Sequence, residues 1–216
     1  MTTKLDSSAR PSRSIANRPL RWLLCSAIAL AISGQAHADA VTDWNATAGS
    51  VAARFGAPQQ QARAMAIVQI AVHDALNSID RRYDVYAIVP PANSGASPEA
   101  AVAAAARTSL LGLLPAVPEN AAAIAIVNGA YATRLAAIAD GTAKEDGVVA
   151  GENAAAAILA MRVGDGSATP HLPYLFGPAA GVYQPTPNPA FPAAITPLFA
   201  GWALVTPFAI RSASQF

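Results

Sequence analysis

The residues best placed to do chemistry lie in the stretch AIVQIAVHDALNSIDRRYDVY, residues 66–86. In a helix, four polar side chains of this stretch recur at i, i+4, i+8 and i+11, so they form one stripe along an otherwise apolar rod. They are Gln69, His73, Asn77 and Asp80. A hydrolytic interpretation makes His73 a general base. The alternative is that the stripe, with the neighbouring Asp74, hydrogen-bonds adjacent helices and positions the turn at 81–86, because buried polar groups need partners.

Metal chemistry finds little support in the spacing of the candidate ligands. No H-x-x-x-H or H-E-x-x-H pattern occurs. His171 is the only other histidine after the leader described below, and a metal pair of His73 with His171 rests on that count alone. The acidic loop Asp140–Gly147 misses the D-x-D-x-D-G spacing of a calcium loop. We therefore expect no metal site and interpret Thr142 and Glu145 as a capping box that starts a helix.

Nucleophilic and phosphate-binding motifs are also absent from the sequence. No G-x-S-x-G occurs, and Ser50 and Ser109 fall in the middle of expected helices. The stretch GDGSATP lacks the lysine and the following helix of a phosphate-binding loop. These observations favour the structural interpretation of the polar stripe, and they identify no catalytic, cofactor-binding or metal-binding residue.

The composition narrows the class of protein. The formal net charge of the chain is +1 and only 12% of its residues are charged, which argues against nucleic acid as a partner. A hydrophobic content of 53% is ample for a buried core.

The amino-terminal region has the pattern of a secretory signal peptide. Basic residues precede the apolar run WLLCSAIALAIS, and an A-x-A site follows at Ala36–Ala38. A membrane anchor would need about 20 apolar residues, and this run is shorter. We expect residues 1–38 to be removed by cleavage after Ala38, and the mature chain to be periplasmic or secreted. Cys25 lies inside the apolar run, so the mature chain has no thiol.

Residues 39–166 have helical periodicity throughout. The expected helices cover 44–55, ending at Gly56; a second from Pro58 through the opening stretch; 98–114, capped by Ser97; 118–140; and 142–163, ending at Gly164. Short connections favour antiparallel packing. The sequence predicts an all-α, antiparallel bundle of about five helices, with the second helix the most buried.

Residues 167–216 differ in character, because prolines and aromatics are dense there. We expect an extended, ordered strap whose aromatic side chains dock on a surface. They are Tyr174, Phe176, Tyr183, Phe191, Phe199, Trp202 and Phe208. The absence of a further packing element near the end suggests a chain that has been cut short, with the strap continuing into a missing carboxy-terminal catalytic bundle.

Two stretches together resemble a known family. They are VTDWNATAG…RAMAIVQIAVHDALNSIDRRYDVY and RVGDGSATPHLPYLFGPAAGVYQPTPNPAF…PLFAGWALVTPFAIRSASQF, which cover nearly all of the mature chain. Their order of short motifs resembles the amino-terminal half of bacterial vanadium-dependent haloperoxidase-like proteins, of the type-2 phosphatidic-acid-phosphatase superfamily. The resemblance implies an all-α fold and a downstream bundle that holds vanadate or phosphate, with halide oxidation by peroxide as the activity of the full-length family.

The resemblance does not extend to the residues that do this chemistry. In the family, the anion is held by residues of K-x6-R-P, P-S-G-H and S-R-x5-H motifs, because a tetrahedral anion needs several fixed donors and a covalent partner. Lys144 is followed by no R-P at that spacing, His171 follows Ala168-Thr169-Pro170 in place of P-S-G, and Arg211-Ser212 inverts the S-R order. We therefore carry no catalytic residue over to this chain.

Two other functions stay open on the sequence alone. One is a stand-alone periplasmic helical module that binds a protein partner through its aromatic strap, since clusters of Tyr, Trp and Phe are typical of interfaces. The other is a fragment of an acid phosphatase of the same superfamily. Halide preference and a homo-oligomeric state are equally open.

Overall fold

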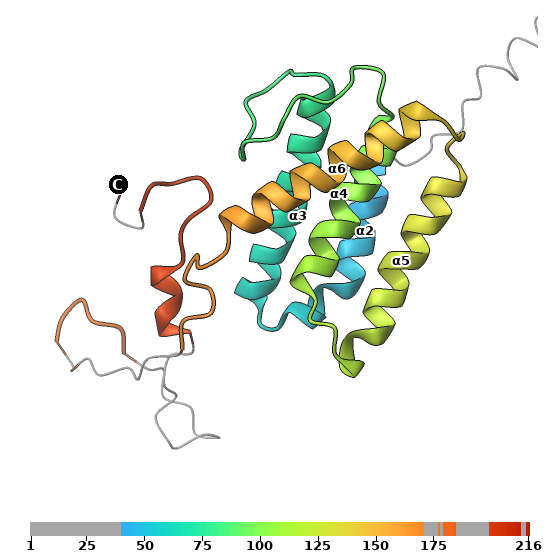
Figure 1. Cartoon of the computed structure of the whole chain (residues 1–216). Helices are drawn as coiled ribbons and strands as arrows, with labels where there is room; N and C mark the ends of the chain where they lie inside the picture. The colour runs from blue at the N-terminus through green and yellow to red at the C-terminus, as the bar shows by residue number, and fades with distance from the viewer. Residues whose placement is uncertain (1–39, 171–176, 178, 185–198, 213–214) are drawn as a thin grey trace, which may run out of the picture. The chain divides into compact units, whose positions relative to one another are not determined.

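Helices form nearly all the regular structure in the computed structural model, which describes residues 40–170, 177, 179–184, 199–212 and 215–216. No strand occurs in these residues. The described residues form five α-helices and three short 3-10 helices (Figure 1): α2 Ala40–Val51, η1 Ala52–Phe55, α3 Pro58–Ile79, α4 Pro98–Leu113, η2 Pro118–Asn120, α5 Ala121–Ala136, α6 Thr142–Met161 and η3 Ala200–Leu204. The predicted all-α class is confirmed. The predicted signal peptide, residues 1–38, lies outside the described residues.

Most helix boundaries lie where the sequence predicts them, at glycine, proline and capping residues. Gly56, with φ of 101°, ends the first helical segment, and Pro58 is the first residue of α3. Ser97 caps α4, because its hydroxyl accepts a hydrogen bond from the Ala100 N–H at 3.2 Å. Gly164, with φ of 70°, follows the end of α6. These boundaries follow from residue types whose backbone preferences are strong.

The predicted capping box at Thr142 and Glu145 is wrong. Thr142 is already the first helical residue, and Gly141 caps α6 with no side-chain bond. Lys144 stabilises this turn instead, since its Nζ donates to Asp140 Oδ1 at 2.9 Å and to the Ile138 carbonyl at 3.2 Å. The hydrogen bond from Lys144 lowers the pKa of the exposed Asp140 carboxyl, and the positive charge of Lys144 lowers it further.

The most buried element is α4, and the prediction that gave this place to α3 is wrong. In α4 the alanines from Ala100 to Ala106, together with Val102 and Leu110, are buried, so side chains all round the helix are enclosed. The reason is position: α4 packs against α2, α3, α5 and α6, whereas α3 keeps one side toward solvent. Alanine-rich sequence permits this arrangement because it lets helix axes approach closely.

The closest helix contact joins α4 and α6, which run in the same direction. The Ser97 N–H donates to the Ala143 carbonyl at 2.7 Å, so the two helices start side by side. Further along, Gly151 lies against the backbone of Ala101 and Ala105, and Gly112 lies against Leu159. In Figure 1, α6 crosses α3 and α4 obliquely. Consecutive helices such as α4 and α5 still pack antiparallel, with Arg107 of α4 bonded to Asn128 of α5.

The predicted extended strap is only partly extended. Within its described residues, Ala200–Leu204 form the 3-10 helix η3, preceded by Phe199 in the left-handed region at φ of 62°. Phe208 packs against the helical core, as the docking prediction requires, whereas Tyr183 is 56% exposed. Tyr174, Phe176 and Phe191 lie outside the described residues. No helix in the described part of the chain is long and apolar enough to cross a bilayer.

Substitution of Gly151 by alanine tests the α4–α6 contact. A Cβ at Gly151 would lie 2.2 Å from the Ala101 carbonyl oxygen, a backbone atom that cannot move independently. We expect Gly151→Ala to lower the free energy of unfolding by about 3 kcal/mol, measured by urea denaturation, because overpacking forces the helices apart.

Gly129→Ala is the matched control for this experiment. Gly129 also lies inside a helix, α5, but a Cβ there meets no atom within 4 Å. It should raise stability by about 0.5–1 kcal/mol through helix propensity. Equal effects of the two substitutions would contradict the close α4–α6 approach.

Candidate functional site

The polar stripe of α3 holds the loop that follows it. The Asn77 side-chain oxygen accepts from the N–H groups of Arg82 at 3.2 Å and Tyr83 at 2.9 Å. His73 Nε2 lies 3.0 Å from the Asp84 carbonyl oxygen. A carbonyl only accepts, so this nitrogen carries the proton and donates. The Asn77 amide nitrogen, 3.3 Å from the same Nε2, is therefore a contact between two donors and not a hydrogen bond.

The two ends of the stripe have other partners. Gln69 donates to Asn45 of α2 at 2.9 Å, which ties α3 to its neighbour. Asp80 forms an exposed ion pair with Arg82 at 2.7 Å. All four residues of the stripe are thus engaged with nearby protein atoms, as the structural interpretation predicts.

Asp74 is the strongest anchor of this region. Its side chain is fully buried and accepts two backbone hydrogen bonds, from Tyr86 and from Ala87, each at 2.8 Å. Charge-assisted bonds of this kind are stronger than neutral ones. The carboxylate therefore fixes the chain where it turns back from α3, and it is enclosed too completely to meet a substrate.

The other sequence candidates form no site in the described residues. His171 lies outside them, so the His73–His171 pair is untested. Ser109 is fully buried, and its hydroxyl has no hydrogen-bond partner among the described residues. Ser50 is exposed and donates to the Thr47 carbonyl at 2.7 Å. No group of three metal-ligating side chains occurs in the described part of the chain.

A second polar cluster, which the sequence does not predict as a site, joins α3 and the end of α6 to residues 199–212, which we call the tail. Asp165, just after α6, has a side chain only 2% exposed. One of its oxygens, Oδ2, accepts from Arg63 Nε at 2.8 Å and from Arg162 Nε at 3.0 Å, and the other accepts from the Ser167 N–H at 3.0 Å. We call Arg63, Arg162 and Asp165 the arginine–aspartate cluster.

The tail is attached directly to this cluster. The Arg162 guanidinium donates to the Thr206 carbonyl at 2.5 Å and lies 3.8 Å from the centre of the Phe208 ring. The Thr206 N–H returns a bond to the Asp165 carbonyl at 2.8 Å. Gly166 allows this approach, because its φ is 90° and a Cβ there would lie 2.7 Å from the Leu204 carbonyl oxygen. The RVGDGS stretch is therefore an anchor for residues 204–208.

Opposing effects act on the pKa of Asp165. Burial favours the neutral acid and works to raise the pKa, but the hydrogen bonds from Arg63 and Ser167, with the charge of Arg63, outweigh it and hold the pKa below its ordinary value. The carboxylate thus stays ionised, as a partner for two arginines must.

In comparisons with known proteins, the sequence matches no family model and no curated protein, and no solved structure matches the chain.

Asp74→Ala tests the first anchor. Removal of the carboxylate leaves the N–H groups of Tyr86 and Ala87 without their acceptor, and each such loss costs about 1–3 kcal/mol. We expect a drop of about 3 kcal/mol in the free energy of unfolding, measured by urea denaturation. Asp84→Ala is the control, because Asp84 is exposed and its carbonyl, the acceptor for His73, is retained. A drop no larger than that of the control would disprove the anchor.

The pH dependence of stability tests the arginine–aspartate cluster. The pKa of Asp165 is lower in the folded chain than in the unfolded chain. The ionised carboxylate therefore contributes its full stabilisation of the fold above the ordinary aspartate pKa of about 3.9, and this stabilisation is lost as the pH falls below that value. We expect Asp165→Asn to lower the free energy of unfolding by about 3–5 kcal/mol at pH 7, because it leaves two arginines without their carboxylate. The loss, measured by urea denaturation, should become smaller as the pH approaches 3.

The exposed Asp80–Arg82 pair supplies the control for this series. Asp80→Asn should cost about 0–1 kcal/mol at pH 7. A loss for Asp165→Asn of the same small size would show that the cluster does not hold the fold.

Proposed function

We propose that this chain is an exported amino-terminal helical scaffold of a vanadium-dependent haloperoxidase-like protein, and that it positions a catalytic bundle without contributing residues to the reaction. The observation that carries the proposal is that the two stretches with the family resemblance supply the two internal anchors. The first stretch contains Asp74 and Asn77, and the second contains Arg162 and Asp165. The distinctive residues of this resemblance are engaged in holding backbone.

His73 lacks the surroundings that a bound vanadate needs. Its Nε2 donates to the Asp84 carbonyl, and although Nδ1 then keeps a lone pair, the cationic side chain that lines the same pocket among the described residues is that of Arg82, which is paired with Asp80. Lys144 is held by Asp140 and Ile138 at the turn between α5 and α6. In this proposal, residues other than His73 and Lys144 therefore bind the cofactor of the family. Those residues also decide between peroxidase and phosphatase chemistry.

Export is part of the same proposal. Cleavage after Ala38 would leave α2 intact, because this helix begins at Ala40, and it would coincide with the start of the compact unit Asp39–Phe216. Such a chain would reach the periplasm or the medium with no thiol, and it would depend on helix packing and on the two anchors for stability.

A stand-alone interaction module is the second candidate function. A cavity of about 380 Å³ runs along α3 beside the tail, with Ala62, Ala66, Trp202, Phe208 and Ile210 among its lining residues. Apolar linings of this kind suit a hydrophobic segment of a protein partner. In this alternative the tail serves recognition and no catalytic bundle exists.

Activity measurements on the mature chain and on the continuing gene product test the scaffold proposal. The mature chain, residues 39–216, should oxidise no bromide with peroxide, whether or not vanadate is added. The reading frame after the codon for Phe216 should continue into K-x6-R-P, P-S-G-H and S-R-x5-H, and the longer product should gain activity that depends on vanadate or should hydrolyse phosphate esters.

Two results would contradict the proposal. Vanadate-dependent bromide oxidation by residues 39–216 alone would show that the chain is itself catalytic. A stop codon directly after Phe216 would favour the interaction module.

A further inference from the structure

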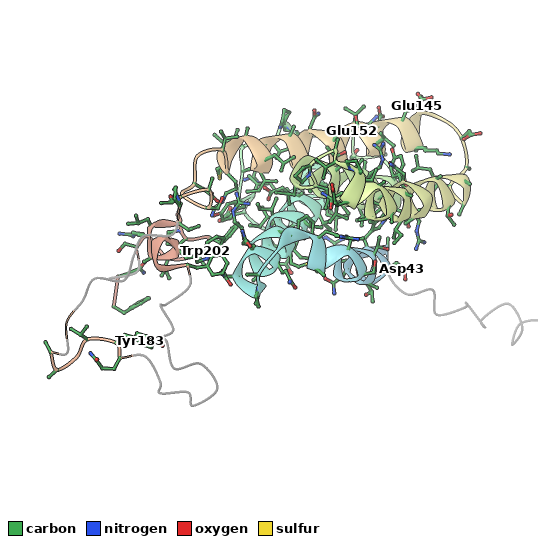
Figure 2. All side chains as sticks on the ribbon, turned by 90° about the horizontal axis from the view of Figure 1, so that it is seen from below. Asp43, Glu145, Glu152, Tyr183 and Trp202 are labelled. Carbon is green, nitrogen blue, oxygen red and sulfur yellow. The ribbon has the colours of Figure 1, made fainter. Side chains whose placement is uncertain are left out.

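A polar pocket distinct from the α3 stripe lies beside the arginine–aspartate cluster. Its volume is about 230 Å³, and it is bounded by η1, the first turns of α3, the end of α4 and the tail. Figure 2 shows Trp202 of the tail next to the helices, in contrast to Tyr183, which lies well away from them. The lining residues are Arg54, Phe55, Gln60, Arg63, Ala64, Leu113, Pro115, Ser167 and Trp202.

The charges around this pocket are not balanced. It is lined by two arginines and, among the described residues, by no carboxylate. Arg63 shares the single oxygen Oδ2 of Asp165 with Arg162, so one negative charge faces two positive charges. Arg54 forms no ion pair with any described residue. Arg63 is half-buried and shares its single carboxylate partner with Arg162, and the exposed Arg54 adds a second positive charge to the lining, so this surplus of positive charge favours an anion in the pocket.

Unused donors line the same space. Arg63 uses Nε on Asp165 and Nη2 on the Arg162 carbonyl, which leaves Nη1 free of bonds to described residues. The side-chain oxygen of Gln60 accepts a hydrogen bond from the Ala57 N–H at 2.8 Å, which leaves the side-chain amide nitrogen available as a donor. Gly56 permits this placement of Gln60, because a Cβ at Gly56 would lie within 2.3 Å of the Gln60 side-chain oxygen. Arginine and amide N–H groups are the donors that carboxylates and phosphates require.

Most of the remaining lining is apolar, because Phe55, Ala64, Leu113, Pro115 and Trp202 contribute to it beside the polar Ser167. The pocket volume is several times the roughly 30 Å³ that one water molecule occupies. We propose that this pocket binds a small organic anion, with its phosphate or carboxylate head group on Arg54 and Arg63 and its apolar part against Trp202. The proposal concerns a site within this chain and does not depend on the proposed scaffold function.

Titration of the purified protein with phenyl phosphate tests this inference, read out by calorimetry and by the fluorescence of Trp202. We expect saturable binding that is tighter than that of inorganic phosphate, and no binding of benzyl alcohol, which has a similar ring and no charge. Arg54→Gln should weaken binding about tenfold or more, because it removes one charge-assisted contact.

Arg81→Gln is the matched control, since Arg81 is also exposed and lies just beyond the opposite end of α3. It should leave affinity unchanged. Trp202→Phe should abolish the fluorescence change while calorimetry still detects binding.

Three results would overturn the assignment. They are the absence of saturable phenyl phosphate binding at constant ionic strength, equal affinity in Arg54→Gln and wild type, and binding of inorganic phosphate as tight as that of phenyl phosphate. None of these results depends on peroxide-dependent bromide oxidation, which tests the scaffold proposal. Either proposal can therefore be disproved without the other.

Discussion

A single buried carboxylate, that of Asp165, holds together the part of the molecule where the helices meet the tail. It accepts from arginines of two different helical segments, while its own backbone carbonyl accepts from Thr206. Loss of one member of such a cluster leaves an uncompensated buried charge, which is far more costly than loss of an exposed pair. The positions of η3 and Phe208 therefore depend on this one ionised group.

The helical part depends on a different constraint, which is the small size of its side chains. Most of the buried side chains of α4 are alanines of its own sequence, and glycines of α6 lie directly on its backbone. Large side chains are few in this interface, so packing relies on close approach of the helix axes. Polar anchors fix the segments that alanine packing does not reach, because Asp74 holds the loop after α3 and Asp165 holds the tail.

The sequence predicted the fold well where local rules apply. Gly56, Pro58 and Ser97 mark helix boundaries because their backbone or side-chain preferences are local properties. The capping box at Thr142 failed, since Gly141 and Lys144 supply an alternative start to α6. The most buried helix cannot be predicted in this way, because burial depends on how many neighbours an element has, and the periodicity of a sequence does not contain that information.

The candidate site shows the same division. The stripe of Gln69, His73 and Asn77 could be predicted because its residues are close in sequence. The pairing of Arg63 with Asp165 joins residues far apart along the chain, and nothing in either local stretch indicates it. The RVGDGS stretch lacks the features of a phosphate-binding loop, and its physical role follows from its contacts with Thr206 and Phe208, which lie far along the chain.

Native-state hydrogen exchange of the mature chain tests the central claim that both polar clusters are anchors. The amides of Tyr86 and Ala87 report on Asp74, and the amides of Ser167 and Thr206 report on Asp165. We predict that these four amides exchange nearly as slowly as the core of α4, although three of them lie in exposed or half-buried segments. Exchange as fast as in an unstructured peptide would contradict this claim and would leave these charged side chains free for another role.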